Sequence, residues 1–233
     1  MTYDDFLKLY KERKKQEKNY DFLGTLLKEI RPRYLREAAA LGKDPNQSWN
    51  SWSGNTFERI VTEIIKDFIA DSDYKVGMTS SKSLGKTNVG KKLDKVKRNL
   101  LVFYNDFAVL PDADIVLFDR QSLLVIAILS CKASLRERVA QSAYWKIKLQ
   151  SAETTKEILC YLASTDNDGD FVIENNERTR NRIIVEFGEI DAAYILRDIQ
   201  RSEKVKNFNE IFADLTVIFQ KWYDAKPKSK TKP

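Results

Sequence analysis

The chain has 233 residues and a mass of 27.1 kDa, with 42% hydrophobic and 32% charged residues, a composition that suits a globular protein with one sizeable core. Its 40 Lys and Arg against 34 Asp and Glu give a formal net charge of +6, a modest excess that favours a polyanionic partner. It has no histidine and only two cysteines, which excludes histidine bases, Ser-His-Asp and Cys-His sites, the usual zinc sites and a disulfide framework.

Apolar runs in the chain are too short to cross a membrane. None approaches the roughly 18 residues that a spanning helix needs, and residues 1–20 are too highly charged for a secretory signal. The two cysteines, Cys131 and Cys160, suit a reducing compartment. We therefore expect a soluble, cytoplasmic protein with no membrane contact.

Residues 1–50 have helical periodicity but no side chains that indicate chemistry. Helices are predicted over residues 3–18, 20–30 and 32–41. Packing or oligomerisation is the expected role of this N-terminal helical region. We divide the chain into that region at residues 1–50, a main domain at residues 51–225 and a basic, disordered tail at residues 226–233.

A polar break is expected at residues 47–55, followed by the strongest helical pattern in the chain. Over residues 56–69 an apolar stripe recurs at helical spacing, formed by Phe57, Ile60, Val61, Ile64, Ile65 and Phe68. Glu58 lies at the edge of that stripe, in the first turn of the predicted helix, where the free backbone amides tolerate an anion.

Residues 75–98 form a basic segment, with eight Lys and Arg against the single acid Asp94. Two interpretations stay open for such a run: a solvated, lysine-rich loop, or a surface that binds phosphates. The residues that we select for contacts with a DNA backbone are Lys82, Lys86, Lys91 and Lys92.

From residue 101 the pattern changes to strands. Strands are predicted over residues 101–104, 115–118, 123–132, 158–163 and 183–187, with a tight turn at 119–122. Helices are predicted over residues 134–152 and 207–222, and a long polar loop over residues 164–180. This order predicts an α/β (α+β) fold in which helices flank a mixed central β-sheet.

The residues that indicate chemistry lie on the two strands joined by the tight turn. Side chains alternate along a strand, so Asp112 shares a face with Asp114, and Ser130 shares one with Lys132. A hairpin would bring the carboxylates of one strand beside the lysine of the other. Carboxylates are ligands for a hard cation such as Mg²⁺, and a neighbouring lysine can orient the water that attacks a phosphate and offset negative charge.

Together, Pro111-Asp112 and Ser130-Cys131-Lys132 resemble the core motif of the PD-(D/E)xK nuclease superfamily, with Ser130 in the position that is usually acidic. The segment Gly54-Asn-Thr-Phe-Glu58 is similar to the first core helix of that superfamily, whose glutamate often joins the metal site. The resemblance implies a restriction-endonuclease-like core, a Mg²⁺ site at Asp112, Asp114 and Glu58, and products with 5′-phosphate and 3′-hydroxyl ends.

The segment that follows the lysine, Lys132-Ala-Ser-Leu-Arg136-Glu137-Arg138, resembles type II restriction endonucleases of the EcoRII and NgoMIV group. That resemblance implies a recognition site built on CCGG, or on CC and GG split by a central base. Arginine suits the O6 and N7 acceptors of guanine, and glutamate accepts from the N4 amine of cytosine. Gln141, one turn further on, is a weaker candidate for a contact to a base or to the DNA backbone. The alternative for Arg136, Glu137 and Arg138 is a helix start whose side chains face water or pair with neighbours one turn away.

The sequence departs from the CCGG-reading group in one respect. That group commonly supplies a glutamate from the helix after the lysine, at positions that Trp145 and Lys146 occupy in this chain. We expect Glu58 to be the third acidic ligand, with Glu153 a poorer candidate. Which of the two aspartates near residue 112 is the main ligand stays open.

Three further acids, Asp166, Asp168 and Asp170, surround Gly169. A calcium loop requires a closing glutamate at a fixed spacing, which this sequence does not have. We interpret the segment as a polar turn.

The function that these features favour is a Mg²⁺-dependent type II restriction endonuclease that acts on double-stranded DNA. A site with two-fold symmetry is read most simply by a homodimer, and higher homo-oligomers are compatible with it. The alternatives are a structure-selective repair or junction nuclease on the same core, and a DNA-binding relative that no longer cuts.

Overall fold

The computed structural model describes residues 1–135 and 137–224. In chain order its helices and strands are α1 (Tyr3–Lys14), α2 (Phe22–Ala40), α3 (Pro45–Ala70), β1 (Val76–Thr79), α4 (Ser81–Leu84), α5 (Gly90–Arg98), β2 (Val102–Tyr104), β3 (Phe107–Val109), β4 (Ile115–Asp119), β5 (Val125–Lys132), α6 (Arg138–Gln150), β6 (Leu159–Ser164), α7 (Arg180–Phe187), β7 (Ala192–Ile195), β8 (Val205–Asn207), the 3₁₀ helix η1 (Phe208–Glu210) and α8 (Ile211–Asp224). No helix among these is long and apolar enough to cross a membrane.

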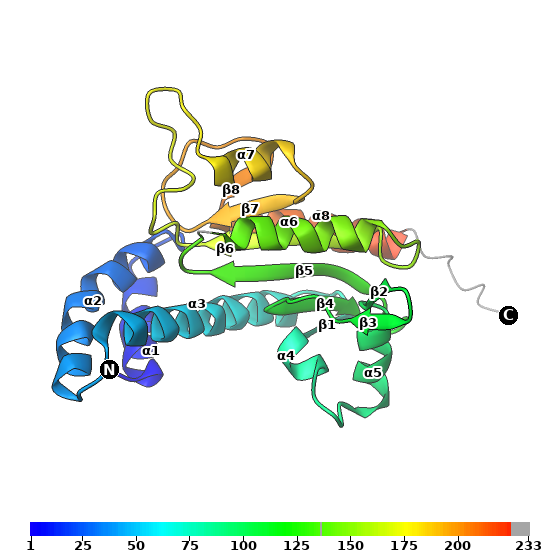
Figure 1. Ribbon diagram of the computed structural model, residues 1–233, viewed down its shortest axis with the longest axis horizontal. Coiled ribbons are helices and arrows are strands. Elements are labelled where there is room, and N and C mark those ends of the chain that lie inside the picture. Colours follow the sequence, from blue (N-terminus) through cyan, green and yellow to red (C-terminus); the bar gives the residue numbers. More distant parts are fainter. Residues whose placement is uncertain (136, 225–233) are drawn as a thin grey trace, which may run out of the picture.

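A mixed six-stranded sheet in the order β1-β4-β5-β6-β7-β8 forms the centre of the molecule (Figure 1). Strand β4 runs antiparallel to both of its neighbours, β1 and β5, and the strands from β5 to β8 run parallel. Every residue of β4 and β5 is buried, as expected of strands with helices on both faces. The predicted fold class, a mixed central sheet flanked by helices, is confirmed.

Helices cover both faces of the sheet, and a separate hydrophobic cluster lies on each face. On one face the long helix α3 and the last helix α8 pack on the strands, and α1 and α2 join the same cluster, which includes Phe6, Leu23, Phe57 and Leu215. On the other face α6 and α7 pack through Val139 and Val185. The N-terminal helical region therefore shares its core with the sheet, and the boundary drawn after Asn50 falls inside α3.

The predicted hairpin between the two chemistry-bearing strands is confirmed. Strands β4 and β5 pair antiparallel with Ile115 opposite Leu129, and a backbone hydrogen bond from Asp114 N to Leu129 O, 3.1 Å, extends the pairing beyond β4. This register brings the residue before β4 to the same end of the sheet as the end of β5.

The polar break predicted at residues 47–55 is wrong, because α3 runs through it without interruption. Asp44 caps the helix by accepting from the backbone N–H of Gln47 at 2.8 Å, and Pro45 occupies its first turn, both of which favour helix initiation there. The helices predicted over residues 20–30 and 32–41 are likewise a single helix, α2, with Pro32 inside it.

The strand predicted over residues 183–187 is also wrong, since these residues lie in α7. Thr179 caps that helix by accepting from the Arg182 N–H at 3.1 Å. Residues 102–104 do form a strand, but β2 pairs with β3 in a separate hairpin and not in the central sheet. The predicted tail at residues 226–233 lies outside the described residues.

Candidate active site

Asp114 and Lys132 form an ion pair at the end of the β4–β5 hairpin. The Lys132 ammonium donates to Asp114 Oδ2 at 2.8 Å, and the backbone N–H of Cys131 donates to the same oxygen at 2.6 Å. The Lys132 and Asp114 side chains are only 9% and 13% exposed, so the pair is weakly screened by water and its members are strongly coupled. The contact that the sequence predicted between these strands is therefore present.

Ser81, at the start of α4, holds the chain that leads to Asp114. Its hydroxyl donates to the Pro111 carbonyl at 2.6 Å and accepts from the Ala113 N–H at 3.0 Å. The Ser81 N–H donates in turn to the Ala113 carbonyl at 3.0 Å. This role was not predicted, since nothing in a lysine-rich segment indicates that one of its serines will anchor a distant part of the chain.

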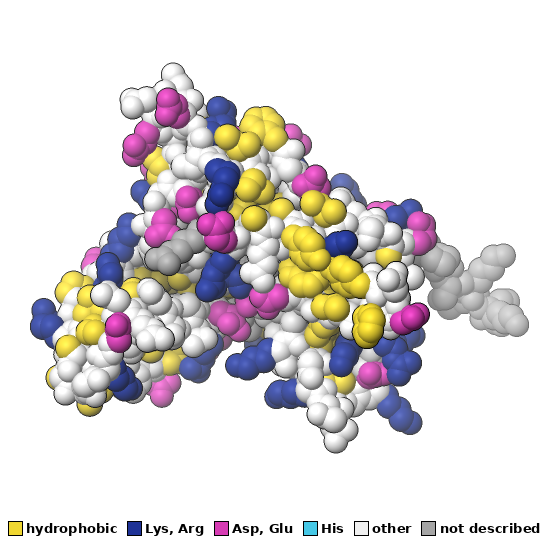
Figure 2. Space-filling model, viewed as in Figure 1, with side chains coloured by type: hydrophobic (Ala, Val, Ile, Leu, Met, Phe, Trp, Pro, Cys, Tyr) yellow, Lys and Arg dark blue, Asp and Glu magenta, His cyan; other side chains and the backbone are white. Residues whose placement is uncertain are grey.

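A cavity of about 570 Å³ opens beside the pair and is lined by residues from α2, α3, the β4–β5 hairpin, the start of α6 and the loop after β6. Its acidic lining side chains are Glu58, Asp114 and Asp168. Its basic lining side chains are Lys28, Arg31, Lys132 and Arg138. Figure 2 shows magenta and dark-blue side chains close together in the hollow between the N-terminal helices and the rest of the molecule. Such a mixture suits a ligand that carries both phosphate and a cation.

Glu58 reaches this cavity from the interior of α3 and not from the start of a helix as predicted. Burial raises the pKa of its carboxyl above the ordinary value, and the negative charges of Asp114 and Asp112 raise it further, while Lys132 and Lys82 act in the opposite direction. A carboxylate destabilised in this way gains stabilisation when a cation arrives.

The donor set fits a Mg²⁺ ion held mainly by its substrate and water. Mg²⁺ is usually bound through one or two carboxylates together with phosphate oxygens and water, and Asp114 and Glu58 supply two carboxylates in one cavity. Among residues 1–135 and 137–224, no cluster of three or more acidic, Cys or His side chains could hold a metal ion. The cavity therefore brings together two of the three acidic ligands that the sequence suggested, Asp114 and Glu58, but not Asp112.

Asp112 and Ser130, two of the predicted catalytic residues, do not line the cavity. Asp112 is exposed and lies just before the ion pair in the chain, whereas Ser130 is buried within β5. Glu153, the poorer candidate for a ligand, pairs instead with Lys156 at the surface, 2.7 Å away. Of the two aspartates left open by the sequence, Asp114 is the one that faces Lys132.

Three of the predicted base-reading residues, Glu137, Arg138 and Gln141, are described by the structure and lie at or near the start of α6. Arg136 lies outside the described residues. Arg138 lines the cavity, and Gln141 is exposed on α6. Glu137 is exposed and pairs with Arg180 of α7, 3.0 Å away. None of these contacts tests base reading, which stays a prediction.

The predicted backbone-binding lysines are all exposed on the α4–α5 segment. Lys82, on α4, lies close enough to Glu58 to affect its pKa. Lys86 follows α4, and Lys91 and Lys92 lie in the first turn of α5. Three of these lysines thus lie on short helices, and Lys86 lies in the loop that joins them.

The loop after β6 also borders the cavity, through Asn167 and Asp168. The Ser134 hydroxyl donates to Asp168 at 2.6 Å, so this loop contacts the segment between Lys132 and α6. The sequence indicated only a polar turn here, and its place at the site was missed. Only the spatial adjacency of parallel strands β5 and β6 could have indicated it.

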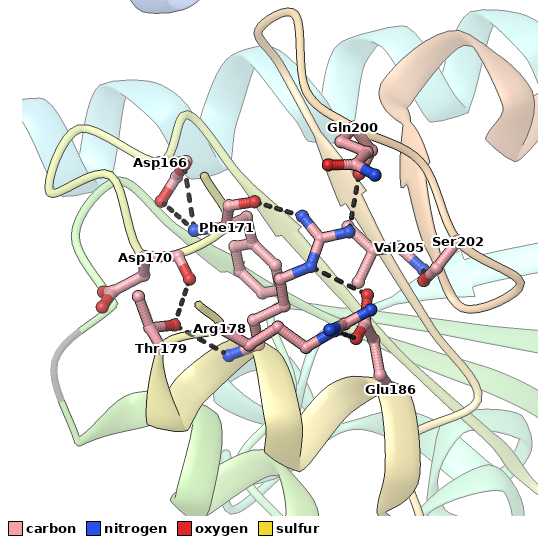
Figure 3. A network of polar contacts seen from close by, with 10 residues as sticks. Asp166, Asp170, Phe171, Arg178, Thr179, Glu186, Gln200, Ser202 and Val205 are labelled. Atoms are coloured by element: carbon pink, nitrogen blue, oxygen red, sulfur yellow. Dashed lines mark hydrogen bonds and ion pairs between the residues drawn. The ribbon is translucent and has the colours of Figure 1, made fainter. Parts of the chain in front are cut away.

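A buried arginine network holds that loop against α7 (Figure 3). Arg182 is 1% exposed and donates to the carbonyls of Phe171 and Gln200 and to Glu186, the last at 2.8 Å. Arg178 donates to the other oxygen of Glu186 at 2.7 Å. The loop is therefore anchored at its far end by charge-assisted hydrogen bonds, which are among the stronger polar contacts in proteins.

Comparison with known protein families gives a match over more than half of the chain. Residues 92–214 match the family described as "BsaWI restriction endonuclease type 2". This segment includes β4, β5 and the Asp114–Lys132 pair, and it ends within α8.

Two curated proteins are similar over most of the chain. A putative type II restriction enzyme, MjaVIP, from Methanocaldococcus jannaschii is 36% identical over 181 residues, 76% of this chain and 79% of that protein. A probable type II restriction enzyme, HpyAORF263P, from Helicobacter pylori is 29% identical over 179 residues, 71% of this chain and 90% of that protein.

A solved structure shares the fold at low sequence identity. The restriction endonuclease PspGI, in a complex with its substrate DNA, superposes with a TM-score of 0.52 and 17% identity, covering 94% of this chain and 78% of that one. The likeness extends over nearly the whole of this chain, and at this identity it concerns the fold alone.

Proposed function

Since this chain belongs to the BsaWI family of type II restriction endonucleases and is a site-specific deoxyribonuclease, we propose that it uses Mg²⁺ to hydrolyse both strands of double-stranded DNA at a short palindromic site. The observation that carries the proposal is the Asp114–Lys132 ion pair, 2.8 Å long, in a cavity that Glu58 also lines. The same region of the chain carries the motif that resembles the PD-(D/E)xK superfamily.

Lys132 is the residue that we assign to the attacking water. Its ammonium has three donors, of which one is directed to Asp114, so the others are available to a water molecule and to an oxygen of the scissile phosphate. The water attacks phosphorus, the bond to the 3′ oxygen breaks, and the products carry 5′-phosphate and 3′-hydroxyl ends. The positive charge offsets the charge that develops on the phosphoryl oxygens.

Asp114 and Glu58 are the carboxylates that we assign to Mg²⁺, with Asp112 outside the cavity as a flanking acid. The ion would supply a Lewis acid that polarises the phosphate and lowers the pKa of bound water. Asp114 keeps its orientation through the Cys131 N–H. Glu58 must lose its proton to bind a cation, and its raised pKa means that acid conditions oppose this step.

The recognition site that we propose contains CCGG, or CC and GG split by a central base. Support comes from the resemblance of the segment after Lys132 and from the chemistry of Arg136, Glu137 and Arg138. Arginine and glutamate are the partners expected for guanine and cytosine in the major groove. Arg138 lies at the cavity, so one short segment can contact bases while Lys132 contacts the scissile phosphate.

Plasmid cleavage with purified protein and Mg²⁺ tests the proposal. Discrete fragments whose ends map to one palindrome are the expected result. The Lys132→Met variant should cut about 10²- to 10⁴-fold more slowly while still binding DNA. Lys156→Met is the matched control, because Lys156 pairs with Glu153 at the surface. A smear or cutting at junctions would favour a repair nuclease, and a mobility shift without cutting would favour an inactive relative.

A further inference from the structure

The far wall of the active-site cavity is formed by the N-terminal helices, to which the sequence assigned only packing or oligomerisation. Lys28 and Arg31 of α2 line the cavity together with Asn50, Gly54 and Asn55 of α3. We call these five residues the α2–α3 wall. They face the same space as Asp114 and Lys132, although the two sets are far apart in sequence.

Neither basic side chain of this wall forms an ion pair with another described residue. Among the described residues Lys28 has no ion pair, and Arg31 makes only a 3.5 Å hydrogen bond to Asn46. Arg33, close by on the same helix, differs because it pairs with Glu37 at 2.7 Å and lines a different cavity. Exposed cations that stay unpaired beside a cavity are available to an anionic ligand.

The presence of a glycine, Gly54, inside helix α3 is not explained by packing. It lies in the interior of α3, where glycine destabilises a helix relative to alanine. Its φ is not positive, and a Cβ at this position would meet no atom within 4 Å. The fold would therefore accept alanine, so the bare backbone suits the close approach of a ligand from the cavity.

The spacing of the wall suits a nucleic acid strand. Lys28 and Arg31 are at i and i+3 on one helix, so their Cβ atoms are about 5–6 Å apart on the same face. That spacing allows contacts to neighbouring phosphates of one strand. The uncharged donors Asn50 and Asn55 on α3 complement them, because amide side chains also bind phosphate and sugar oxygens.

We propose that the α2–α3 wall binds the DNA backbone beside the scissile phosphate, with Lys28 and Arg31 each neutralising a phosphate and Gly54 admitting the strand close to α3. The proposal rests on the proposed function, since it places the strand that Lys132 attacks. The DNA backbone is then contacted by this wall and by Lys82 of α4, whose charge acts on Glu58.

The first test is the salt dependence of binding to a labelled, mixed-sequence DNA duplex, with Mg²⁺ omitted to prevent cutting. Lys28→Gln and Arg31→Gln should each weaken binding about five- to tenfold at roughly 100 mM salt and reduce the slope of log K against log salt by about 0.9. Arg33→Gln is the control on the same helix and should leave the slope unchanged.

The second test separates DNA contact from folding. Gly54→Ala should raise the Tm slightly, because alanine favours the helix, yet weaken binding of the same duplex about fivefold or more. A variant that is more stable and binds less well cannot be explained by damage to the fold.

The outcomes distinguish the wall from the proposed function. If the unaltered protein neither binds nor cuts DNA, the proposed function fails and the wall with it. If the unaltered protein binds and cuts, but the two glutamine variants keep its salt slope or Gly54→Ala binds equally well, the wall alone is refuted.

Discussion

At the residue scale, the two aspartates before β4 have different surroundings. Asp114 accepts from Lys132 and from the Cys131 N–H and is largely buried, whereas Asp112 is exposed and lies outside the cavity lining. In the sequence, the Pro-Asp context favoured Asp112 as the main metal ligand, and the position just before an apolar strand favoured Asp114 for the same role. Burial and the contact with Lys132 favour Asp114 as the metal ligand.

Substitution of each aspartate by asparagine tests this difference. Asp114→Asn should lower the cleavage rate about 10²- to 10⁴-fold, because the amide removes one of two carboxylates that we assign to the metal. Asp112→Asn should lower it less than about tenfold, since its charge acts only from a distance. Cleavage rates at saturating Mg²⁺ measure both. Equal losses in the two variants would contradict the assignment.

Asp166, next to the loop residues that line the cavity, is fully buried. Burial raises the pKa of its carboxyl to about 6, although the Phe171 N–H and the charge of Arg197 oppose the shift. Between the unfolded pKa near 3.8 and the folded pKa, the folded protein holds a proton that the unfolded chain has lost. The stabilisation from this group is therefore complete below pH 3.8 and is lost as the pH rises through about 6.

The Asp166→Asn variant should remove that pH dependence. Between about pH 4 and 6, the free energy of unfolding of the unaltered protein should fall relative to the variant by up to about 3 kcal/mol. Urea denaturation followed by circular dichroism at several pH values gives the difference. A difference that stays flat, or that rises with pH, would show that Asp166 is ionised throughout.

At the element scale, the hairpin that carries the site was predictable and the elements around it were less so. A long apolar run, a short polar turn and alternating side chains specify β4 and β5 locally. Helix α7 was mistaken for a strand because Ile183, Ile184 and Val185 are β-branched. The capping residue Thr179 and the Arg182–Glu186 pair, one turn apart, outweigh that propensity.

The short strands and the cavity wall depend on contacts that a local pattern does not contain. Strand β1 has four residues and β8 has three, and each is defined by its partner in the sheet. Helix α3 was divided at residues 47–55 because several polar positions there face the cavity and not the core. The polar character was interpreted correctly, but its cause is the site and not a break in the helix.

Arg182 connects helix α7 to the loop after β6 through a hydrogen bond to the Phe171 carbonyl, and substitution of Arg182 tests this contact. Arg182→Met keeps most of the side-chain volume but leaves two carbonyls without a donor and removes one of the cations beside Glu186. Breaking a buried ion pair by removing one partner costs about 3–5 kcal/mol, and this loss should appear in urea denaturation. Arg180→Met should cost less than about 1 kcal/mol, because the Arg180–Glu137 pair is exposed. Similar losses in both variants would show that the network in Figure 3 does not anchor the loop.

At the scale of the whole molecule, the β4–β5 hairpin and the N-terminal helices line one cavity. The family match begins at residue 92 and includes Lys132, whereas Glu58 and the α2–α3 wall lie before it. Because α1, α2 and α3 share the core of the sheet, the position of the wall relative to the ion pair is fixed by packing. The N-terminal helices are therefore packed as one unit with the hairpin that carries the ion pair.

Each chain offers one Asp114–Lys132 pair, and a double-strand cut needs an attack on each strand. If two copies act together on a palindrome, each copy cuts one strand. A mixed dimer of the unaltered chain with the Lys132→Met chain should then cut only the strand that meets the intact site. The expected product is nicked circular plasmid that accumulates without being converted to the linear form.

The measurement is gel electrophoresis of supercoiled plasmid, with a tag on one chain to isolate the mixed dimer. The pure unaltered dimer should give linear DNA, and the pure variant should give neither product. The Lys156→Met chain is the matched partner for the control, because its dimer with the unaltered chain keeps two intact sites. Linear DNA from the mixed Lys132→Met dimer, formed as fast as from that control, would mean that a single site cuts both strands in turn. A second intact active site would then not be needed for the double-strand cut.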